Sequence, residues 1–225
     1  YYYMNGPNTY PEGPVETVKA RYFEFPLGHR GLYVSHLNFT QKGIWGIKVS
    51  VPNNAGGREG LLFTFEVNQN TTAPDIGDPI PATRNRTVND VSSLKQLTTS
   101  NNPDEFLYQK TVKDVLDSGM PLVLTFSSPA FCTSALCGPQ VEVLSSLRKK
   151  HMDTVEFLHI DLYENPNEIQ GDLSLAVRTP ILDQWRVESD EWTFVVDREG
   201  RVVARFEGFV GELELGEVLS LSFGL

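Results

Sequence analysis

The chain contains only two cysteines, Cys132 and Cys137, in the stretch Ser128-Pro-Ala-Phe-Cys-Thr-Ser-Ala-Leu-Cys-Gly-Pro-Gln140. Two thiols this close can form a redox couple, a structural disulfide or half of a metal site, or they can simply be buried. A chain of 225 residues can bury a core without cross-links, so a disulfide here is optional for stability. All four interpretations are therefore open at this point.

The spacing of the two cysteines restricts the backbone between them. On a regular helix, residues i and i+5 have Cα atoms about 8.5 Å apart, beyond the roughly 7 Å at which a disulfide can no longer form. Pro139 disfavours helical geometry at Gly138 and suits the first helical position. We therefore expect the helix to begin near Pro139, with both cysteines on an irregular loop that a disulfide can close.

The elements that must position these cysteines follow from hydrophobic periodicity after about residue 104. Short apolar runs predict strands, apolar residues at helical spacing predict helices, and an Asp-x-x-Gly turn predicts a hairpin. The order is β-α-β-α-β-β-α after a first helix, with parallel strands first and an antiparallel hairpin last. The expected segments are helix 112–119, strand 121–126, a helix containing 141–147, strand 155–160, helical region 173–185 interrupted by Pro180, hairpin 192–206 and helix 212–221.

A cysteine just after a strand and before a helix, within this order, resembles the thioredoxin-like superfamily over roughly residues 104–225. The residues that carry the resemblance are Leu122–Phe126 followed by Cys132, then Pro139, and the hairpin Trp192–Gly208. The resemblance implies an α/β thioredoxin-like fold (βαβαββα) and thiol–disulfide exchange. Cys132 would then be the nucleophile and Cys137 would resolve the mixed disulfide.

Glu191 occupies the position where thioredoxin-like oxidoreductases have a cis-proline facing the cysteines. Most of these proteins also space their cysteines i, i+3. A carboxylate beside a thiol raises the pKa of that thiol, so Glu191 opposes activation. These differences keep a second interpretation open, in which the protein is a redox-inactive accessory subunit of an envelope or membrane assembly and the disulfide is structural.

The stretch Cys132-Thr-Ser-Ala-Leu-Cys137 is also similar to one class of peroxiredoxins, which carries a peroxidatic and a resolving cysteine at this spacing. That class has Thr or Ser, Pro and Arg where this chain has Pro129, Thr125 and Glu191. A peroxidase, or a protein that handles Cu(I) through soft thiolates, is therefore a third interpretation. No resident metal or other cofactor is expected.

In residues 1–75, apolar and polar side chains alternate as is typical of short β-strands. Apolar side chains recur at every second position from Trp45 to Val51 and from Leu61 to Val67. We expect an N-terminal all-β sandwich, which resembles the immunoglobulin-like domains of exported bacterial proteins. Residues 76–103 are rich in Pro, Asn and Thr and are predicted to be a linker, which leaves 104–225 as the thioredoxin-like domain.

Six further side-chain positions have simple structural interpretations. His151 is expected to end a helix and His159 to lie in a strand, and neither is expected to bind a metal. The acidic side chains of Asp161 and Glu164 follow a parallel strand and are expected to be solvated. Trp45 and Trp192 are expected to be core residues.

Charge and composition limit the partners. Lys and Arg number 19 against 29 Asp and Glu, and the net charge of −10 disfavours nucleic acid. No apolar run approaches the roughly 20 residues of a transmembrane helix. The first residue is Tyr1, so we expect a processed or truncated chain, which allows membrane-complex association or a lost N-terminal anchor. A protein partner and an extracytoplasmic location, periplasmic or on the cell surface, are expected from the predicted disulfide and the resemblance.

Overall fold

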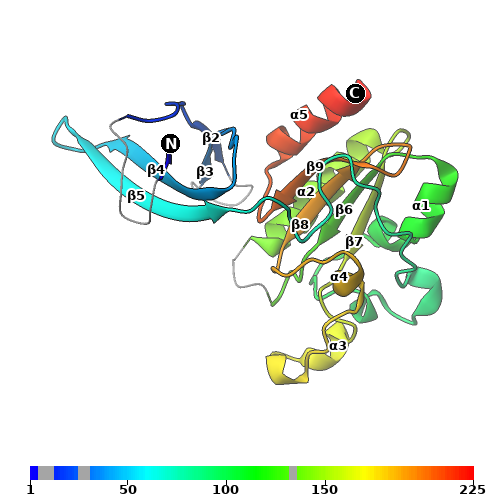
Figure 1. Ribbon diagram of the computed structural model, residues 1–225. Helices are drawn as coiled ribbons and strands as arrows, with labels where there is room; N and C mark the ends of the chain where they lie inside the picture. The colour runs from blue at the N-terminus through cyan, green and yellow to red at the C-terminus, as the bar shows by residue number, and fades with distance from the viewer. Residues whose placement is uncertain (5–12, 25–30, 132–135) are drawn as a thin grey trace. The chain divides into compact units, whose positions relative to one another are not determined.

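The computed structural model describes residues 1–4, 13–24, 31–131 and 136–225. It divides the chain into two compact units, shown in Figure 1. The first contains Tyr1–Phe23 and Gly31–Thr71, and Thr72–Leu225 belong to the second. Within the described ranges, no helix is long and apolar enough to cross a membrane.

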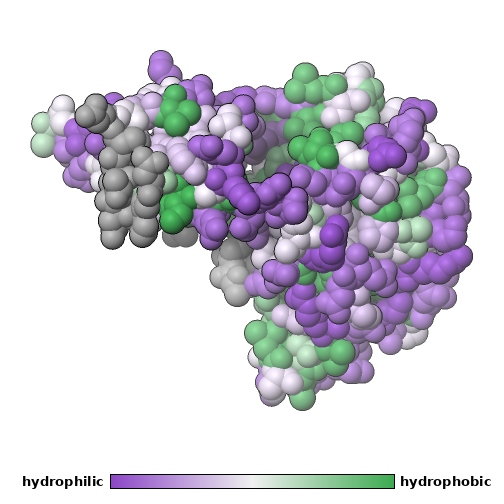
Figure 2. Space-filling model, in the orientation of Figure 1, coloured by the Kyte–Doolittle hydropathy of each residue, from purple (hydrophilic) through white to green (hydrophobic). Residues whose placement is uncertain are grey.

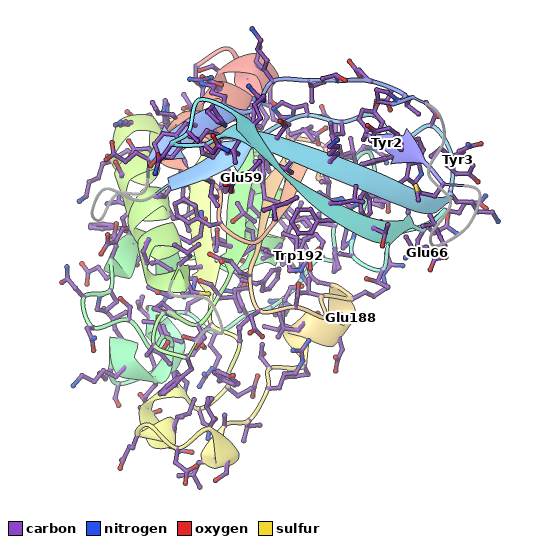
Figure 3. All side chains as sticks on the ribbon, turned by 90° about the vertical axis from the view of Figure 1, so that its left-hand side faces the viewer. Tyr2, Tyr3, Glu59, Glu66, Glu188 and Trp192 are labelled. Atoms are coloured by element: carbon purple, nitrogen blue, oxygen red, sulfur yellow. The ribbon has the colours of Figure 1, made fainter. Side chains whose placement is uncertain are left out.

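The first unit is built on a long antiparallel hairpin. Its strands β4 and β5 pair over their full length, from Gly43 opposite Val67 to Pro52 opposite Arg58. Glu59 and Glu66, labelled in Figure 3, lie near the two ends of β5. The described strands form a three-stranded sheet, β1-β4-β5, and a two-stranded sheet, β2-β3. Their bounds are β1 Tyr2–Tyr3, β2 Arg21–Glu24, β3 Gly31–Val34, β4 Gly43–Pro52 and β5 Arg58–Val67.

Trp45 is the centre of the core of the first unit, as predicted. Its ring packs against Tyr1, Tyr3 and Phe39, and its side chain is almost fully buried. Its indole N–H donates to the carbonyl of Gln41 over 3.0 Å. This arrangement confirms the inward-facing side of the predicted strand at Trp45, while the immunoglobulin-like sandwich remains a prediction.

The second unit contains a four-stranded sheet in the order β7-β6-β8-β9. Strands β6 and β7 are parallel, whereas β8 runs antiparallel to both β6 and β9. The order and directions follow the predicted parallel pair and terminal hairpin. The strands are β6 Leu122–Phe126, β7 Glu156–Ile160, β8 Trp192–Val196 and β9 Val202–Glu207.

Two hydrophobic cores cover the two faces of this sheet. Side chains of α1 and α4 pack with Leu124, Phe126 and Phe194 on one face. Side chains of α2, α5 and η3 pack with Val123 and Val195 on the other. The helices are α1 Val112–Ser118, α2 Cys137–His151, α3 Pro166–Ile169, α4 Ile181–Gln184, α5 Glu212–Phe223, and the 3-10 turns η1 Val88–Asp90, η2 Leu94–Gln96, η3 Glu105–Tyr108 and η4 Leu173–Leu175.

The second unit therefore has the predicted thioredoxin-like topology (Figure 1). Helix α1 ends at Gly119, whose positive φ of 67° closes the helix as expected. Trp192 is buried in the core, as predicted. The predicted helical region 173–185 is wrong in extent, because only η4 and α4 are helical. Pro180 explains the break, since its ring disfavours helical geometry at the preceding residue.

Residues 76–103, predicted to be a linker, belong to the second compact unit. Their start runs beside β9, because the N–H of Gly77 donates to Val202 and the N–H of Ile80 donates to Gly200. Their later part contains η1 and η2 and buries Leu97 in the core on the α2 side. The segment therefore contributes side chains to the same unit as the cysteines.

One hydrophobic area of the second unit is exposed. Figure 2 shows apolar colouring over the region of α3 and η4. Leu173, Leu175 and Val177 have more than half of their surface exposed there. The area is separate in sequence from the strand ends that hold the predicted site.

Candidate functional site

The cysteine loop, defined here as residues 127–136, connects β6 to α2. Its first residues, Ser127 and Ser128, are completely buried. A turn follows, closed by the N–H of Phe131 donating to the carbonyl of Ser128 over 3.1 Å. Pro129 is at the second position of this turn, where its fixed φ is favourable. The loop therefore begins from a rigid, buried strand end.

Cys137 is the first residue of α2, and its side chain is completely buried. The expectation that the helix begins near Pro139, with both cysteines outside it, is wrong for Cys137. Pro139 is tolerated because the first-turn N–H groups lack partners within a helix, and Gly138 has no Cβ to clash with the proline ring. Cys132 lies outside the described residues, so its disulfide with Cys137 stays a prediction.

Cys137 lies on the sheet-facing side of α2. Cys137, Gln140, Val141 and Leu144 have the i, i+3, i+4, i+7 spacing of one helix face, and all four are buried. Gln140 is the polar member, and its Oε1 accepts a hydrogen bond of 2.8 Å from the N–H of Val210. Its Nε2 has no hydrogen-bond partner among the described residues. The cysteine is thus directed toward the layer between α2 and the sheet.

Glu191 precedes β8, directly before Trp192, which is labelled in Figure 3. Trp192 pairs with Phe126, so the antiparallel register places Glu191 opposite Ser127, at the base of the cysteine loop. Side chains alternate along β8, with Thr193 and Val195 on the α2 side. Continued back by one residue, the same alternation directs Glu191 to that side. Glu191 therefore occupies the position that the resemblance assigned to a cis-proline, and the described residues contain no cis peptide bond.

The carboxyl group of Glu191 is removed from water. Only 5% of the residue is exposed, and Oε1 has no hydrogen-bond partner among the described residues. Removal from water raises the pKa of the carboxyl to about 7. Glu191 can therefore gain or lose a proton near neutral pH, which the sequence argument, based only on its charge, did not predict.

His159 lies in β7, as predicted, and it joins a buried polar layer on the α2 side of the sheet. Its Nε2 is 3.0 Å from the carbonyl oxygen of Ser127, which can only accept, so Nε2 carries the proton. Nδ1 then accepts from the hydroxyl of Tyr108 over 2.8 Å. Burial lowers the pKa of His159 to about 4, which keeps the ring neutral at physiological pH.

Tyr108→Phe is expected to lower the free energy of unfolding by about 1 to 3 kcal/mol, because it leaves Nδ1 of His159 buried without its donor. Chemical denaturation at pH 7 measures the loss. Tyr33→Phe, at an exposed position, is the matched control and should change stability by less than about 0.5 kcal/mol. Equal stabilities of the two variants would contradict the assigned hydrogen bond.

Asp161 directly follows β7. The prediction that its side chain is solvated is wrong, because the residue is buried. Its Oδ2 accepts from both the N–H (2.8 Å) and the hydroxyl (2.9 Å) of Thr99. Desolvation raises the pKa of Asp161 to about 6, against the lowering effect of these hydrogen bonds. Asp161 also lines a small cavity of about 180 Å³ with Arg84, Arg86, Tyr108, His159, Tyr163 and Glu164.

Cys137 follows the carboxyl end of β6 in the chain, and Glu191 lies opposite Ser127 at the same strand end, beside the buried polar layer. His151 ends α2, as predicted, and does not join this site. Among the described residues, no group of three or more His, Cys, Asp or Glu side chains is arranged to hold a metal ion. Thr99 and Tyr108 were missed, because isolated Thr and Tyr residues have no spacing that marks a site.

No protein-family model matches the chain, and no curated protein matches it. Solved structures resemble it in part. One is a thiol:disulfide interchange protein of the thioredoxin family from Chlorobium tepidum TLS, with 13% identity over 67% of this chain and 99% of that one, at a TM-score of 0.45. Another is a thiol:disulfide interchange protein from Bacteroides sp., with 14% identity, 68% and 92% coverage and a TM-score of 0.42.

Proposed function

We propose that the second unit carries out thiol–disulfide exchange through Cys132 and Cys137. The observation that carries the proposal is the position of Cys137, completely buried at the first residue of α2, directly after the cysteine loop. Helix N-termini stabilise thiolates, so this position suits a cysteine that must react as an anion. The burial of Cys137 leaves the first attack to Cys132.

The exchange then has two steps. The Cys132 thiolate attacks a disulfide of the substrate, forms a mixed disulfide and releases one substrate thiolate. Cys137 then attacks the Cys132 sulfur, closes the Cys132–Cys137 disulfide and releases the second substrate thiolate. Two electrons pass from the protein dithiol to the substrate, and the reverse reaction oxidises a substrate dithiol.

Glu191 is proposed to take the proton of Cys137 in the second step. Both side chains are directed into the layer between α2 and the sheet, and the pKa of about 7 lets the carboxyl act as a base near neutral pH. A protein substrate in an extracytoplasmic compartment fits a protein that forms a disulfide. A β domain (1–75) and a redox domain (104–225) belong to the same proposal, and the predicted linker (76–103) packs with the residues of the redox domain.

The test measures insulin reduction in the presence of dithiothreitol and the reduction potential of the protein against glutathione. We expect turnover, and a potential between about −120 and −270 mV, the range of catalytic dithiols. A potential below about −300 mV without turnover would instead identify a structural disulfide. That outcome would support the redox-inactive, partner-binding interpretation.

A further inference from the structure

Thr99 connects three segments that are far apart in the sequence. Its hydroxyl donates to Oδ2 of Asp161 over 2.9 Å and accepts from the N–H of Ala130 over 3.1 Å. The same oxygen is 3.1 Å from the hydroxyl of Ser128. We call Thr99, Asp161, Ser128 and Ala130 the Thr99 clamp. A single hydroxyl thus joins the end of β7 to the backbone of the cysteine loop.

The clamp is held firmly at both ends. Thr99 is fixed by a second hydrogen bond, from its own N–H to Asp161, and the preceding Thr98 is buried. Asp161 also accepts from the N–H of Tyr163 over 3.3 Å. Ser128 is completely buried at the end of β6. The hydroxyl oxygen of Thr99, which accepts the hydrogen bond from the N–H of Ala130, therefore has little freedom to move.

Ala130 is the part of the clamp that matters for the thiols, because it lies two residues before Cys132. Its N–H bond to Thr99, with the turn bond from Phe131 to Ser128, determines the direction in which the loop leaves β6. Cys137 is fixed independently, by its burial in α2. Ala130 thus fixes the start of the short chain segment that leads to Cys132.

We propose that Thr99 is a positioning residue for the cysteine pair, acting through Ala130 and anchored by Asp161. This inference rests on the proposed function and deepens it. By restricting the start of the cysteine loop, the clamp raises the effective concentration of one thiol at the other. The disulfide is thereby stabilised relative to the dithiol, without any contact between Thr99 and sulfur.

Thr99→Val tests the proposal, because it keeps the branched shape and removes only the hydroxyl. We expect the equilibrium constant for forming the Cys132–Cys137 disulfide against glutathione to fall about tenfold, a shift of roughly 30 mV toward easier reduction. Thiol alkylation followed by mass spectrometry measures the constant. Thr99→Ser restores the hydroxyl and should remain within about twofold of the unsubstituted protein.

Thr83→Val is the matched control for a loss of stability alone. Thr83 is also buried, and its hydroxyl accepts from the indole of Trp185 over 2.9 Å. It belongs to no part of the clamp, so this variant should lower the denaturation midpoint and leave the equilibrium constant unchanged. If Thr99→Val and Thr83→Val behave alike, Thr99 has only a structural role and the proposal is wrong.

Asp161→Asn provides a second variant should Thr99→Val fail to fold. It replaces one acceptor oxygen of the clamp and should also lower the constant, and an unchanged constant would contradict the proposal. The measurement also separates this inference from the proposed function, because it requires no turnover. If the protein forms no Cys132–Cys137 disulfide at any glutathione ratio, both the proposed exchange activity and the positioning role of Thr99 are wrong. If the protein does not reduce insulin but its disulfide equilibrium constant depends on Thr99, only the proposed exchange activity is wrong.

Discussion

Replacing Cys137 by serine is expected to trap the protein as a mixed disulfide with its substrate. Cys132 can still attack, but the thiol that resolves the intermediate is gone. Turnover of insulin should fall at least about 100-fold, because an external thiol must replace an intramolecular one that acts at a high effective concentration. Non-reducing electrophoresis and mass spectrometry after incubation with insulin detect the covalent adduct.

Cys132→Ser is the control, since it also leaves a single cysteine. That cysteine is completely buried in α2, so this variant should form no adduct and show no turnover. Adducts of equal yield from both variants would contradict the assignment of Cys132 as the nucleophile. Circular dichroism of the two reduced variants checks that the second unit still folds, as expected for a chain that buries two cores without needing a cross-link.

The fold of the second unit was largely predictable, because its strands are continuous apolar runs. Leu122–Phe126 and Trp192–Val196 are buried at every position, and such runs are typical of central strands covered on both faces. Alternation likewise predicted β4 and β5 of the first unit as strands, whereas their pairing as a hairpin is a finding of the structure. Residues 173–185 were less predictable, since Pro180 leaves only short turns that packing, rather than periodicity, determines.

The sequence singled out the two cysteines and Glu191, of which Cys137 and Glu191 lie within the described residues. The start of α2 was misplaced because a proline within the first helical turn has no strong effect on the position of that start. The burial of Asp161 was missed because it depends on Thr99, which is 62 residues away. Polar networks of this kind arise from tertiary packing, so the local sequence around Thr99 contains no signal for them.

The buried polar groups at the carboxyl end of β6 lower the stability of the fold, so their presence calls for a functional explanation. A buried carboxyl such as that of Glu191, whose Oε1 has no hydrogen-bond partner in the described part of the chain, is destabilising in its ionised form. An apolar residue would fill the same layer at less cost. Perturbed carboxyl groups of this kind are concentrated at functional sites. The combination of Glu191 with a fully buried cysteine therefore favours a chemical role over a purely structural one.

Glu191→Gln is accordingly expected to stabilise the protein at neutral and alkaline pH while slowing exchange. The carboxyl pKa is raised from 4.5 in the unfolded chain to about 7 in the folded one, so folding favours the protonated form. This contribution is fully present below pH 4.5 and is lost as the pH rises through 7. Since one pKa unit corresponds to about 1.4 kcal/mol, the variant should gain on the order of 3 kcal/mol over the unsubstituted protein between pH 4.5 and 8.

Chemical denaturation at several pH values measures this difference. Asp161 and His159 also titrate in this range, but they are present in both proteins and cancel in the comparison. Glu188→Gln is the control for the change of net charge, because it removes a carboxyl group from an exposed residue three positions before Glu191 (Figure 3). A stability difference for Glu191→Gln that does not vary with pH would show that the carboxyl is not held protonated by burial. Exchange at an undiminished rate would show that Cys137 loses its proton to another group.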